Sequence, residues 1–247
     1  MPNRDDVPVP LYYRIREDLR DSIMSGELRP GDRISSEREL CEEHGVSGIT
    51  VKRAVLDLVA EGLLYRVPGK GTFVAQPKME RDLSRLSSFT DEMLHRGLKP
   101  DSTVLEASTI SARGSVAKSL ELSPGEEVIY VERVRFADGV PLMLEKTFLP
   151  HKLFPNLLTR DLARQSLYDL ITQEYGVSLA KARETLEPVI INDREAENLA
   201  IEEGAPGLLL ELIAYSDEGT PVEYTKAIVR GDRCKYYIEM GGFRRKT

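Results

Sequence analysis

Residues 30–74 have the sequence PGDRISSERELCEEHGVSGITVKRAVLDLVAEGLLYRVPGKGTFV, which decides the fold of the N-terminal part of the chain. Ser36 followed three residues later by Glu39 has the form of a capping box, which predicts the start of a short helix. Gly45 predicts the end of that helix, and Ser47 predicts the cap of the next one. Two short helices separated by a glycine turn are typical of a helix-turn-helix.

The residues after Ser47 extend this prediction to a winged helix. Apolar residues recur at helical spacing until Gly62, and the predicted core positions are Val51, Val55, Leu58 and Val59. Two strand-like runs follow, LLYRV and TFVA, and the turn PGKG between them predicts a β-hairpin with a basic tip. The pattern alone leaves one alternative open, a small helical bundle with an incidental hairpin.

One further helix is predicted before this stretch, in LYYRIREDLRDSIMSGEL at residues 11–28. Its apolar residues are spaced four apart, and Gly26 lies close to its expected end. The apolar stripe consists of Leu11, Ile15, Leu19 and Ile23. The N-terminal part is therefore expected to contain three helices and a hairpin.

The composition is that of a globular protein with room for two domains. The chain has 247 residues, of which 41% are hydrophobic and 30% are charged. No apolar run approaches the roughly 20 residues of a membrane span, and the start MPNRDDVPVP does not resemble a signal peptide. We therefore expect a cytoplasmic protein without a membrane partner. The net charge of −7 does not exclude nucleic acid, because a small basic face can bind phosphate on an acidic protein.

The sequence offers little for catalysis or metal binding. Cys41 and Cys234 lie far apart without a CxxC partner, which predicts free thiols rather than a disulfide or a zinc site. The GKG at residues 69–71 lacks the spacing of a P-loop, and the 3 histidines stand alone. We predict no catalytic residues, no cofactor and no metal, and a protein that is not an enzyme. Acid–base chemistry by Glu145 or Glu223 stays open, because pairs in space cannot be inferred from one sequence.

Domain boundaries are predicted from the loss of periodicity after the wing. The polar stretch AQPKMERDLSR that follows Val74 is typical of a linker. We therefore expect a DNA-binding domain at 1–76, a linker at 77–87 and a second domain at 88–247.

The second domain contains an internal repeat, in which the segment at 117–141 aligns with the segment at 196–221. Matched pairs are Ala117 with Ala196, Leu120 with Leu199, Gly125 with Gly204, Glu132 with Glu211, Asp138 with Asp217 and Pro141 with Pro221. Each copy has the pattern of a helix, a glycine turn and two strands joined by a turn. The repeat predicts an α+β domain of antiparallel hairpins related by an approximate two-fold axis.

The repeat also singles out two arginines. Arg133 and Arg135 have Leu212 and Ala214 as their partners in the second copy. Alternate residues of a strand share a face, so the second copy indicates that this face is buried. Two guanidinium groups on such a face need an anion, either nearby carboxylates or a bound phosphate or carboxylate ligand. The alternative is pairing with neighbouring glutamates on a solvated sheet.

The helix after Ser47 offers a polar face that suits DNA. In a winged helix this helix enters the major groove, and the wing meets the minor groove or the backbone. The candidate contacts are Arg38, Ser47, Thr50, Lys52, Arg53 and Lys70. The alternative interpretation is an ordinary solvated helix face.

These motifs carry a resemblance to a known family. The SER start, the serine-capped TVK helix and the GKGTFV wing within residues 30–74 resemble the DNA-binding domain of the GntR family of bacterial transcription regulators. The segments LSSFTDEMLHRGLKP, ERVRFADGVPLMLE and YTKAIVRGDR resemble the UTRA effector domain of the HutC subfamily, which has a chorismate-lyase-like fold. The resemblance covers almost the whole chain. It implies a homodimeric repressor that binds a pseudo-palindromic operator in double-stranded DNA and is controlled by a small effector.

Within that subfamily the chain is similar to repressors that respond to phosphorylated N-acetylglucosamine or glucosamine. The resemblance implies DNA contacts by Arg38, Thr50, Lys52, Gly69, Lys70 and Gly71. It implies phosphate contacts by Ser88, Phe89, Thr90, Arg133, Arg135, Ser166 and Tyr168. It implies sugar contacts by Glu145 and Glu223, and the expected effector site includes Arg230 from the third matching segment.

Two positions depart from the family pattern. The family usually has arginine where this chain has Gly48, which bears on the operator, and the amino-sugar group has tyrosine where this chain has Val229, which bears on the effector. We predict a repressor released from DNA by a phosphorylated sugar or a similar small anion. The alternatives are a regulator that responds to a different carboxylate or anion, a chorismate-lyase-like enzyme, and an architectural DNA-binding protein with an empty, collapsed cavity.

Overall fold

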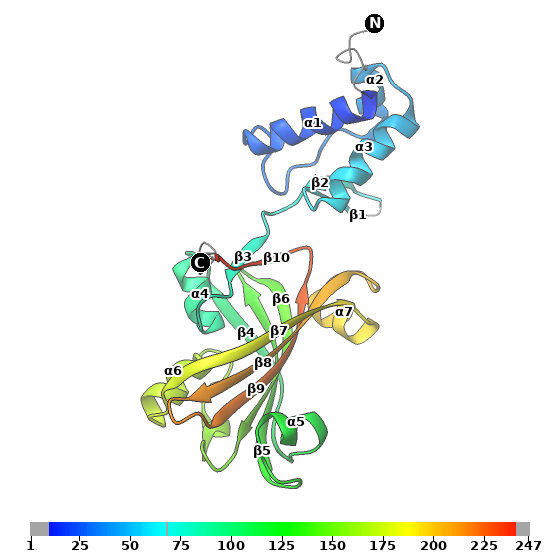
Figure 1. The fold of residues 1–247 in the computed structure, drawn as a ribbon. Coiled ribbons are helices and arrows are strands. Elements are labelled where there is room, and N and C mark those ends of the chain that lie inside the picture. The colour runs from blue at the N-terminus through cyan, green and yellow to red at the C-terminus, as the bar shows by residue number, and fades with distance from the viewer. Residues whose placement is uncertain (1–9, 68, 241–247) are drawn as a thin grey trace, which may run out of the picture. The chain divides into compact units, whose positions relative to one another are not determined.

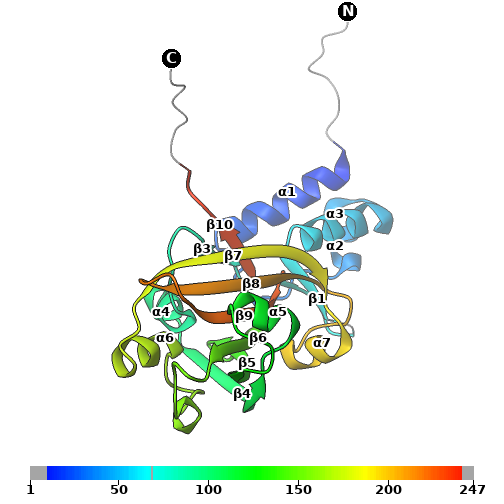
Figure 2. The ribbon, with the colours of Figure 1, turned by 60° about the horizontal axis from the view of Figure 1, so that its bottom comes forward.

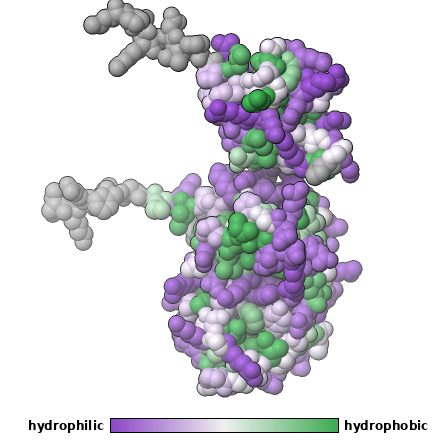
Figure 3. Space-filling view, turned by 90° about the vertical axis from the view of Figure 1, so that its right-hand side faces the viewer, coloured by the Kyte–Doolittle hydropathy of each residue, from purple (hydrophilic) through white to green (hydrophobic). Residues whose placement is uncertain are grey.

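The computed structural model describes residues 10–67 and 69–240. The chain divides between Met79 and Glu80 into two compact units, which are described separately here. Within the described residues, no helix is long and apolar enough to cross a membrane. On the face shown in Figure 3, apolar side chains form patches that are separated by hydrophilic ones.

The N-terminal unit is a winged helix, as the sequence predicts (Figure 1). Its elements are α1 (Leu11–Met24), α2 (Glu37–His44), α3 (Gly48–Ala60), β1 (Leu64–Val67) and β2 (Gly71–Val74). The strands β1 and β2 pair in an antiparallel hairpin, which is the wing. An isolated bridge between Arg33 and Phe73 ties the segment before α2 to β2.

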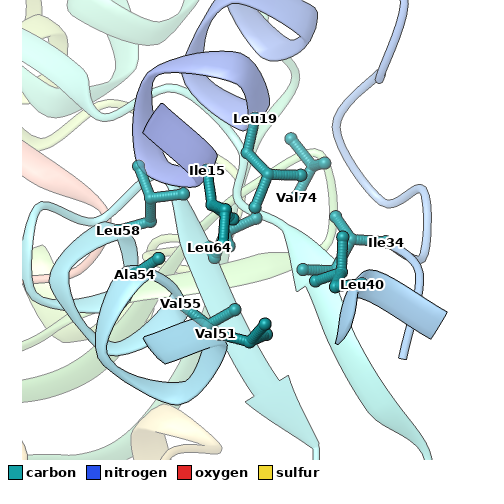
Figure 4. Close-up of a cluster of buried hydrophobic side chains, with 10 residues drawn as sticks. All are labelled: Ile15, Leu19, Ile34, Leu40, Val51, Ala54, Val55, Leu58, Leu64 and Val74. Carbon is teal, nitrogen blue, oxygen red and sulfur yellow. The ribbon is translucent and has the colours of Figure 1, made fainter. Parts of the chain in front are cut away.

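A single cluster of buried apolar side chains holds this unit together (Figure 4). It consists of Ile15, Leu19, Ile34, Leu40, Val51, Ala54, Val55, Leu58, Leu64 and Val74. All three helices and both strands of the wing contribute, so the hairpin is part of the core and not an incidental addition. Leu11, the first residue of the predicted apolar stripe, lies outside this core, because its side chain is 53% exposed at the start of α1.

The ends of the helices follow the predicted signals with one difference. Ser36 and Glu39 form the capping box at the start of α2, and Gly45 ends that helix in the left-handed conformation with φ of 64°. Ser47 occupies the N-cap position of α3, but its side chain makes no capping hydrogen bond. Its hydroxyl lies 2.9 Å from the hydroxyl of Thr50 instead.

The C-terminal unit is built on a 6-stranded antiparallel sheet with the order β4-β5-β6-β9-β8-β7. The strands are β4 (Pro100–Ser111), β5 (Glu127–Ala137), β6 (Val140–Pro150), β7 (Leu179–Ile190), β8 (Pro206–Ser216) and β9 (Pro221–Arg230). Its helices are α4 (Phe89–His95), α5 (Gly114–Ser119), α6 (Leu167–Asp169) and α7 (Asp193–Leu199), with a short 3-10 helix η1 (Leu157–Thr159) and a π-helix η2 (Leu170–Glu174). Figure 2 shows the sheet as a curved layer with β7 and β4 at its two edges.

The strand order confirms the approximate two-fold axis that the repeat predicts. Counted from the two edges to the centre, the sheet has the order β4-β5-β6 on one side and β7-β8-β9 on the other. At the centre Lys146 of β6 pairs with Lys226 of β9, its own counterpart in the repeat. The axis therefore passes between these two lysines.

The two faces of the sheet are covered differently. On one face, α5 packs against Phe148 and Tyr224, and α7 packs against Val134 and Leu144. On the other face, residues of α4 and α6 come together with Arg133 and other side chains of the central strands. This second face holds the candidate site of the unit.

The predicted linker contains a strand. Residues Met79–Asp82 form β3, which pairs with β10 (Cys234–Tyr237) near the end of the described chain. The backbone N–H of Leu83 also donates to the carbonyl of Tyr237, at 2.9 Å. The middle of the stretch that lacked periodicity is therefore anchored by long-range pairing.

Candidate functional site

Arg133 and Arg135 project from β5 into the interior of the C-terminal unit. Their residues are only 2% and 4% exposed, so the prediction that this face is buried is confirmed. Arg133 donates to Oε1 of Glu145 through Nη2 at 2.5 Å and through Nε at 3.1 Å. Its Nη1 donates to the carbonyl of Leu162 at 3.2 Å. Arg133 is thus well satisfied by the protein itself.

Arg135 has much poorer partners. Its Nη2 donates to the hydroxyl of Thr90 at 3.4 Å, and its Nη1 lies 3.7 Å from Oε1 of Glu145. The guanidinium carbon lies 4.4 Å from the centre of the Phe89 ring, while Nε is buried without a partner among the described residues. Burial lowers the pKa of Arg135 to about 10, and the charge of Arg133 adds to this effect against the opposing charge of Glu145. A buried cation with unused donors is a strong candidate for binding an anion.

The pKa values of two glutamates beside these arginines are shifted in opposite directions. Burial acts to raise the pKa of Glu145, but the charges of Arg133 and Arg135 outweigh it and hold that pKa below its ordinary value. The pKa of Glu223 is raised, chiefly by burial and further by the charge of Glu145. The site therefore combines an ionised carboxylate with one that favours its neutral form.

The surroundings of Glu223 are polar but incompletely paired. Thr225 donates its hydroxyl proton to Oε1 of Glu223 at 2.7 Å. Oε2 makes no hydrogen bond of good geometry among the described residues, although the nearby Tyr168 hydroxyl acts to lower the pKa of Glu223. Burial and the charge of Glu223 raise the pKa of Tyr168 well above its ordinary value. Tyr168 is therefore a neutral hydrogen-bond donor at the wall of the site.

These side chains surround a small cavity between the sheet and the helices α4 and α6. Its lining comprises Arg81, Ser87, Ser88, Phe89, Thr90, Arg133, Arg135, Met143, Glu145, Leu167, Tyr168, Leu210, Leu212, Glu223, Thr225 and Ala227. Its volume of about 60 Å³ is enough for a few water molecules. Small-molecule sites usually measure about 300 to 1,000 Å³, so a ligand of the size of a sugar phosphate requires side chains to move.

The structure brings eight of the ten predicted effector residues to this cavity. Ser166 lies just outside the lining, where it is 5% exposed and caps α6 by accepting from the backbone N–H of Asp169. Arg230 lies elsewhere. Its guanidinium donates to Asp232 at 3.0 and 2.7 Å and to the carbonyls of Pro141 and Leu199 at 3.2 Å. Arg230 is therefore not part of the cavity lining, and Asp232 and two backbone carbonyls hold its guanidinium.

Sequence reasoning missed Arg81, which also lines the cavity. Arg81 follows the division between the two units and lies on β3. Its Nε lies 2.9 Å from Oε2 of Glu92 on α4, and its Nη1 lies 3.6 Å from Oε1 of Glu184 on β7. Since Arg81 falls in the stretch without periodicity, no local signal in the sequence marked it.

The candidate DNA contacts lie on the N-terminal unit. Lys52 and Arg53 are exposed on α3, and the guanidinium of Arg53 stacks over the ring of Tyr12 with 3.9 Å to its centre. The side chain of Arg38 is 79% exposed on α2 and pairs with Glu42 at 3.1 Å. An exposed ion pair of this kind is weak, so Arg38 is free to exchange Glu42 for a phosphate or a base.

The wing tip owes its shape to glycine. Gly69 and Gly71 have φ of 72° and 129°, conformations that other residues rarely adopt, and they flank the exposed Lys70. A Cβ atom at Gly71 would lie 2.7 Å from Nε of Arg33. Pro68, the first residue of the predicted PGKG turn, lies outside the described residues.

Two family models match the chain, one to each unit. The model of bacterial regulatory proteins of the gntR family matches residues 11–74. The model of the UTRA domain matches residues 95–235. The chain belongs to the GntR family of transcription regulators. Its N-terminal winged helix is therefore a DNA-binding domain, and its UTRA domain is an effector-binding domain rather than an enzyme.

Individual relatives of this GntR-family protein agree with that assignment. The chain is 38% identical over 229 residues to the HTH-type transcriptional repressor NagR of Bacillus subtilis, covering 93% of this chain and 94% of that protein. It is 32% identical over 226 residues to the histidine utilization repressor of Pseudomonas putida, covering 92% and 90%. The crystal structure of PhnF from Mycobacterium smegmatis is similar with a TM-score of 0.66 and 29% identity, covering 93% of this chain and 100% of that one.

Proposed function

We propose that this GntR-family protein is a repressor whose binding to operator DNA is relieved by a small phosphorylated sugar, such as N-acetylglucosamine-6-phosphate or glucosamine-6-phosphate. The observation that carries the proposal is the buried guanidinium of Arg135, whose donors are largely unused. The similarity to the repressor NagR supports the role as a repressor, and similarity to the mannosyl-D-glycerate transport/metabolism system repressor MngR of Escherichia coli, at 30% identity over 229 residues, supports a role in the use of sugars.

In this proposal different side chains of the cavity bind different parts of the ligand. Arg133 and Arg135 bind the phosphate group, because guanidinium groups match phosphate in charge and in donor geometry. The hydroxyl of Thr90, already in contact with Arg135, lies beside that position. Glu145 and Glu223 accept hydrogen bonds from the hydroxyl or amino groups of the sugar.

Ligand binding requires the Arg133–Glu145 ion pair to rearrange. The two side chains are joined inside a cavity of about 60 Å³ and occupy part of the space that a sugar phosphate needs. Exchange of the carboxylate for a phosphate keeps both arginines paired while the cavity opens. The effector-bound and effector-free forms therefore differ in the packing of α4 and α6 against the sheet.

Arg81 connects this cavity to the chain that leads to the DNA-binding unit. It lines the cavity and lies on β3, directly after the division between the units. A change in the cavity is therefore transmitted to β3 and alters the freedom of the two DNA-binding units of a homodimer. By linkage, an effector that weakens DNA binding must itself bind more weakly to the DNA-bound protein.

Thermal unfolding of the full-length protein tests this proposal. N-acetylglucosamine-6-phosphate or glucosamine-6-phosphate is expected to raise the melting temperature by a few degrees, whereas unphosphorylated N-acetylglucosamine is not. Arg135→Met should abolish the shift, and Arg230→Met, a matched change of a buried arginine outside the cavity, should keep it. If no sugar phosphate shifts the wild-type protein, the sugar hypothesis is wrong.

A second candidate is a smaller carboxylate or other anion as effector. The small volume of the cavity and the fully buried Val229, where the amino-sugar group has tyrosine, favour this alternative. The same assay with a panel of small carboxylates and inorganic phosphate distinguishes the two. The small cavity is also compatible with an architectural protein without an effector, and the absence of a shift with any of these anions would favour that hypothesis.

A further inference from the structure

Ile49 is the most exposed large apolar side chain among the described residues, with 85% of its surface open to solvent. It is the second residue of α3, next to Gly48. The core cluster of the unit takes its residues from the opposite face of this helix, at Val51, Val55 and Leu58. The fold therefore buries little of this isoleucine, and covering it by a partner would be favourable.

The neighbours of Ile49 indicate what covers it. Residues three and four positions apart on a helix share a face, so Ile49 lies beside Lys52 and Arg53. Both are exposed, and the exposed face continues to Leu56, which is 44% open to solvent. A partner for this face must therefore combine negative charge with an apolar group. The major groove of DNA has both, because phosphates line its edges and each thymine presents a C5-methyl group in it.

Gly48 makes close approach to that groove possible. A Cβ atom at Gly48 would meet nothing within 4 Å, so the start of α3 is open on this side. Because glycine has no side chain, Ile49 is the first residue of α3 that carries one.

We propose that Ile49 contacts the C5-methyl group of a thymine in each half-site of the operator and selects thymine at that position. This inference rests on the proposed binding to a specific operator and names one determinant of its sequence. Lys52 and Arg53 on the same face supply the attraction to phosphate, while Ile49 supplies the discrimination. Loss of one buried methyl group is expected to weaken binding roughly fourfold, since burial of one carbon is worth about 0.8 kcal/mol.

Replacing thymine by deoxyuridine tests the proposal, because the two bases differ only in that methyl group. An operator is first selected from a random duplex library with the full-length protein, and each thymine is then replaced singly by deoxyuridine. For the wild type, one position in each half-site should lose about fourfold in affinity. For Ile49→Ala the same replacement should change nothing. Leu56→Ala, an apolar change further along the same face, should keep the wild-type sensitivity.

The outcomes separate this inference from the proposed function. Selection of a specific operator together with equal binding of every deoxyuridine variant by the wild type would overturn the role of Ile49 and leave the repressor proposal standing. A deoxyuridine effect that persists in Ile49→Ala would also overturn it. If no sequence is enriched at all, both fail. Because Ile49 lies on the surface, Ile49→Ala should have the circular dichroism spectrum and melting temperature of the wild type.

Discussion

Nη2 of Arg133 lies 2.5 Å from Oε1 of Glu145, and the two residues face each other directly across β5 and β6. The side chain of Arg133 is 3% exposed and that of Glu145 is 12% exposed, and Glu145 also lies 3.7 Å from Nη1 of Arg135. One carboxylate is therefore the nearby counter-charge of two guanidinium groups. This arrangement makes the ligand-free cavity depend on Glu145 for its charge balance.

Glu145→Gln should consequently destabilise the ligand-free protein by roughly 3 to 5 kcal/mol, because it leaves buried positive charge without a counter-charge. A phosphate-containing ligand should restore part of that loss, so it should raise the melting temperature of Glu145→Gln more than that of the wild type. Chemical denaturation with and without ligand measures both effects. An equal ligand-induced shift in the two proteins would show that ligand and Glu145 do not compensate the same charges.

Arg230→Met should destabilise the protein without changing its response to effector. Arg230 closes the loop after β9 through Asp232 and two backbone carbonyls, and it takes no part in the cavity. Removal of this buried cation leaves those acceptors unpaired and should cost about 1 to 3 kcal/mol. Urea denaturation measures the loss, and titration calorimetry should give an unchanged effector affinity. A large loss of affinity would place Arg230 back in the effector site.

Glu223→Gln should stabilise the protein at neutral pH but not in acid. The folded-state pKa of Glu223 is raised above its ordinary value of 4.5, mainly by burial. Ionisation of this residue therefore costs the folded state stability, a cost that is absent below the unfolded pKa and grows as the pH rises towards the folded pKa. Glutamine avoids the cost and can still accept a hydrogen bond from Thr225.

Denaturation of wild type and Glu223→Gln between about pH 4 and pH 8 checks this sign. The two stabilities should converge at the acid end and diverge as the pH increases. A stability difference that does not vary with pH would mean that Glu223 keeps its ordinary pKa in the fold.

Gly48→Arg should increase affinity for operators that carry guanine opposite the start of α3. The position has open space and helical backbone geometry, so an arginine fits without strain. A bidentate contact from arginine to guanine is worth roughly 1 to 3 kcal/mol. Fluorescence anisotropy with guanine-containing and guanine-free duplexes measures the gain, with Gly48→Ala as the control for helix propensity. Unchanged affinity would mean that this end of α3 stays away from the base edges.

The winged helix could be predicted because its signals are local. The capping box at Ser36 and the glycines at positions 45 and 62 each act within a few residues of their own helix. The sheet could be predicted because the repeat supplied a second copy of the same pattern. The pairing of β3 with β10 had no such signal, since it joins segments as far apart as Glu80 and Lys235, separated by 155 positions.

The effector site shows the same division between local and long-range information. The buried arginines of β5 could be found from the repeat, whereas Arg81 enters the cavity only through the pairing of β3 with β10. The position of Arg230 outside the cavity lining could also have been inferred from the sequence. Glu223 and Thr225 line the cavity from alternate positions of β9, and a residue with an even number on this strand faces the other way.

The duplicated sheet has one consequence for any molecule that enters the cavity. The scaffold is nearly the same on both sides of its axis, but Arg133 and Arg135 of β5 have Leu212 and Ala214 of β8 as counterparts. The β5 side of the cavity therefore carries two arginines and the β8 side carries Leu210 and Leu212, while Arg81 lines the cavity next to Glu184 of β7. The two halves of the repeated fold thus present different chemistry to a ligand, and an asymmetric ligand is expected to bind with a preferred orientation.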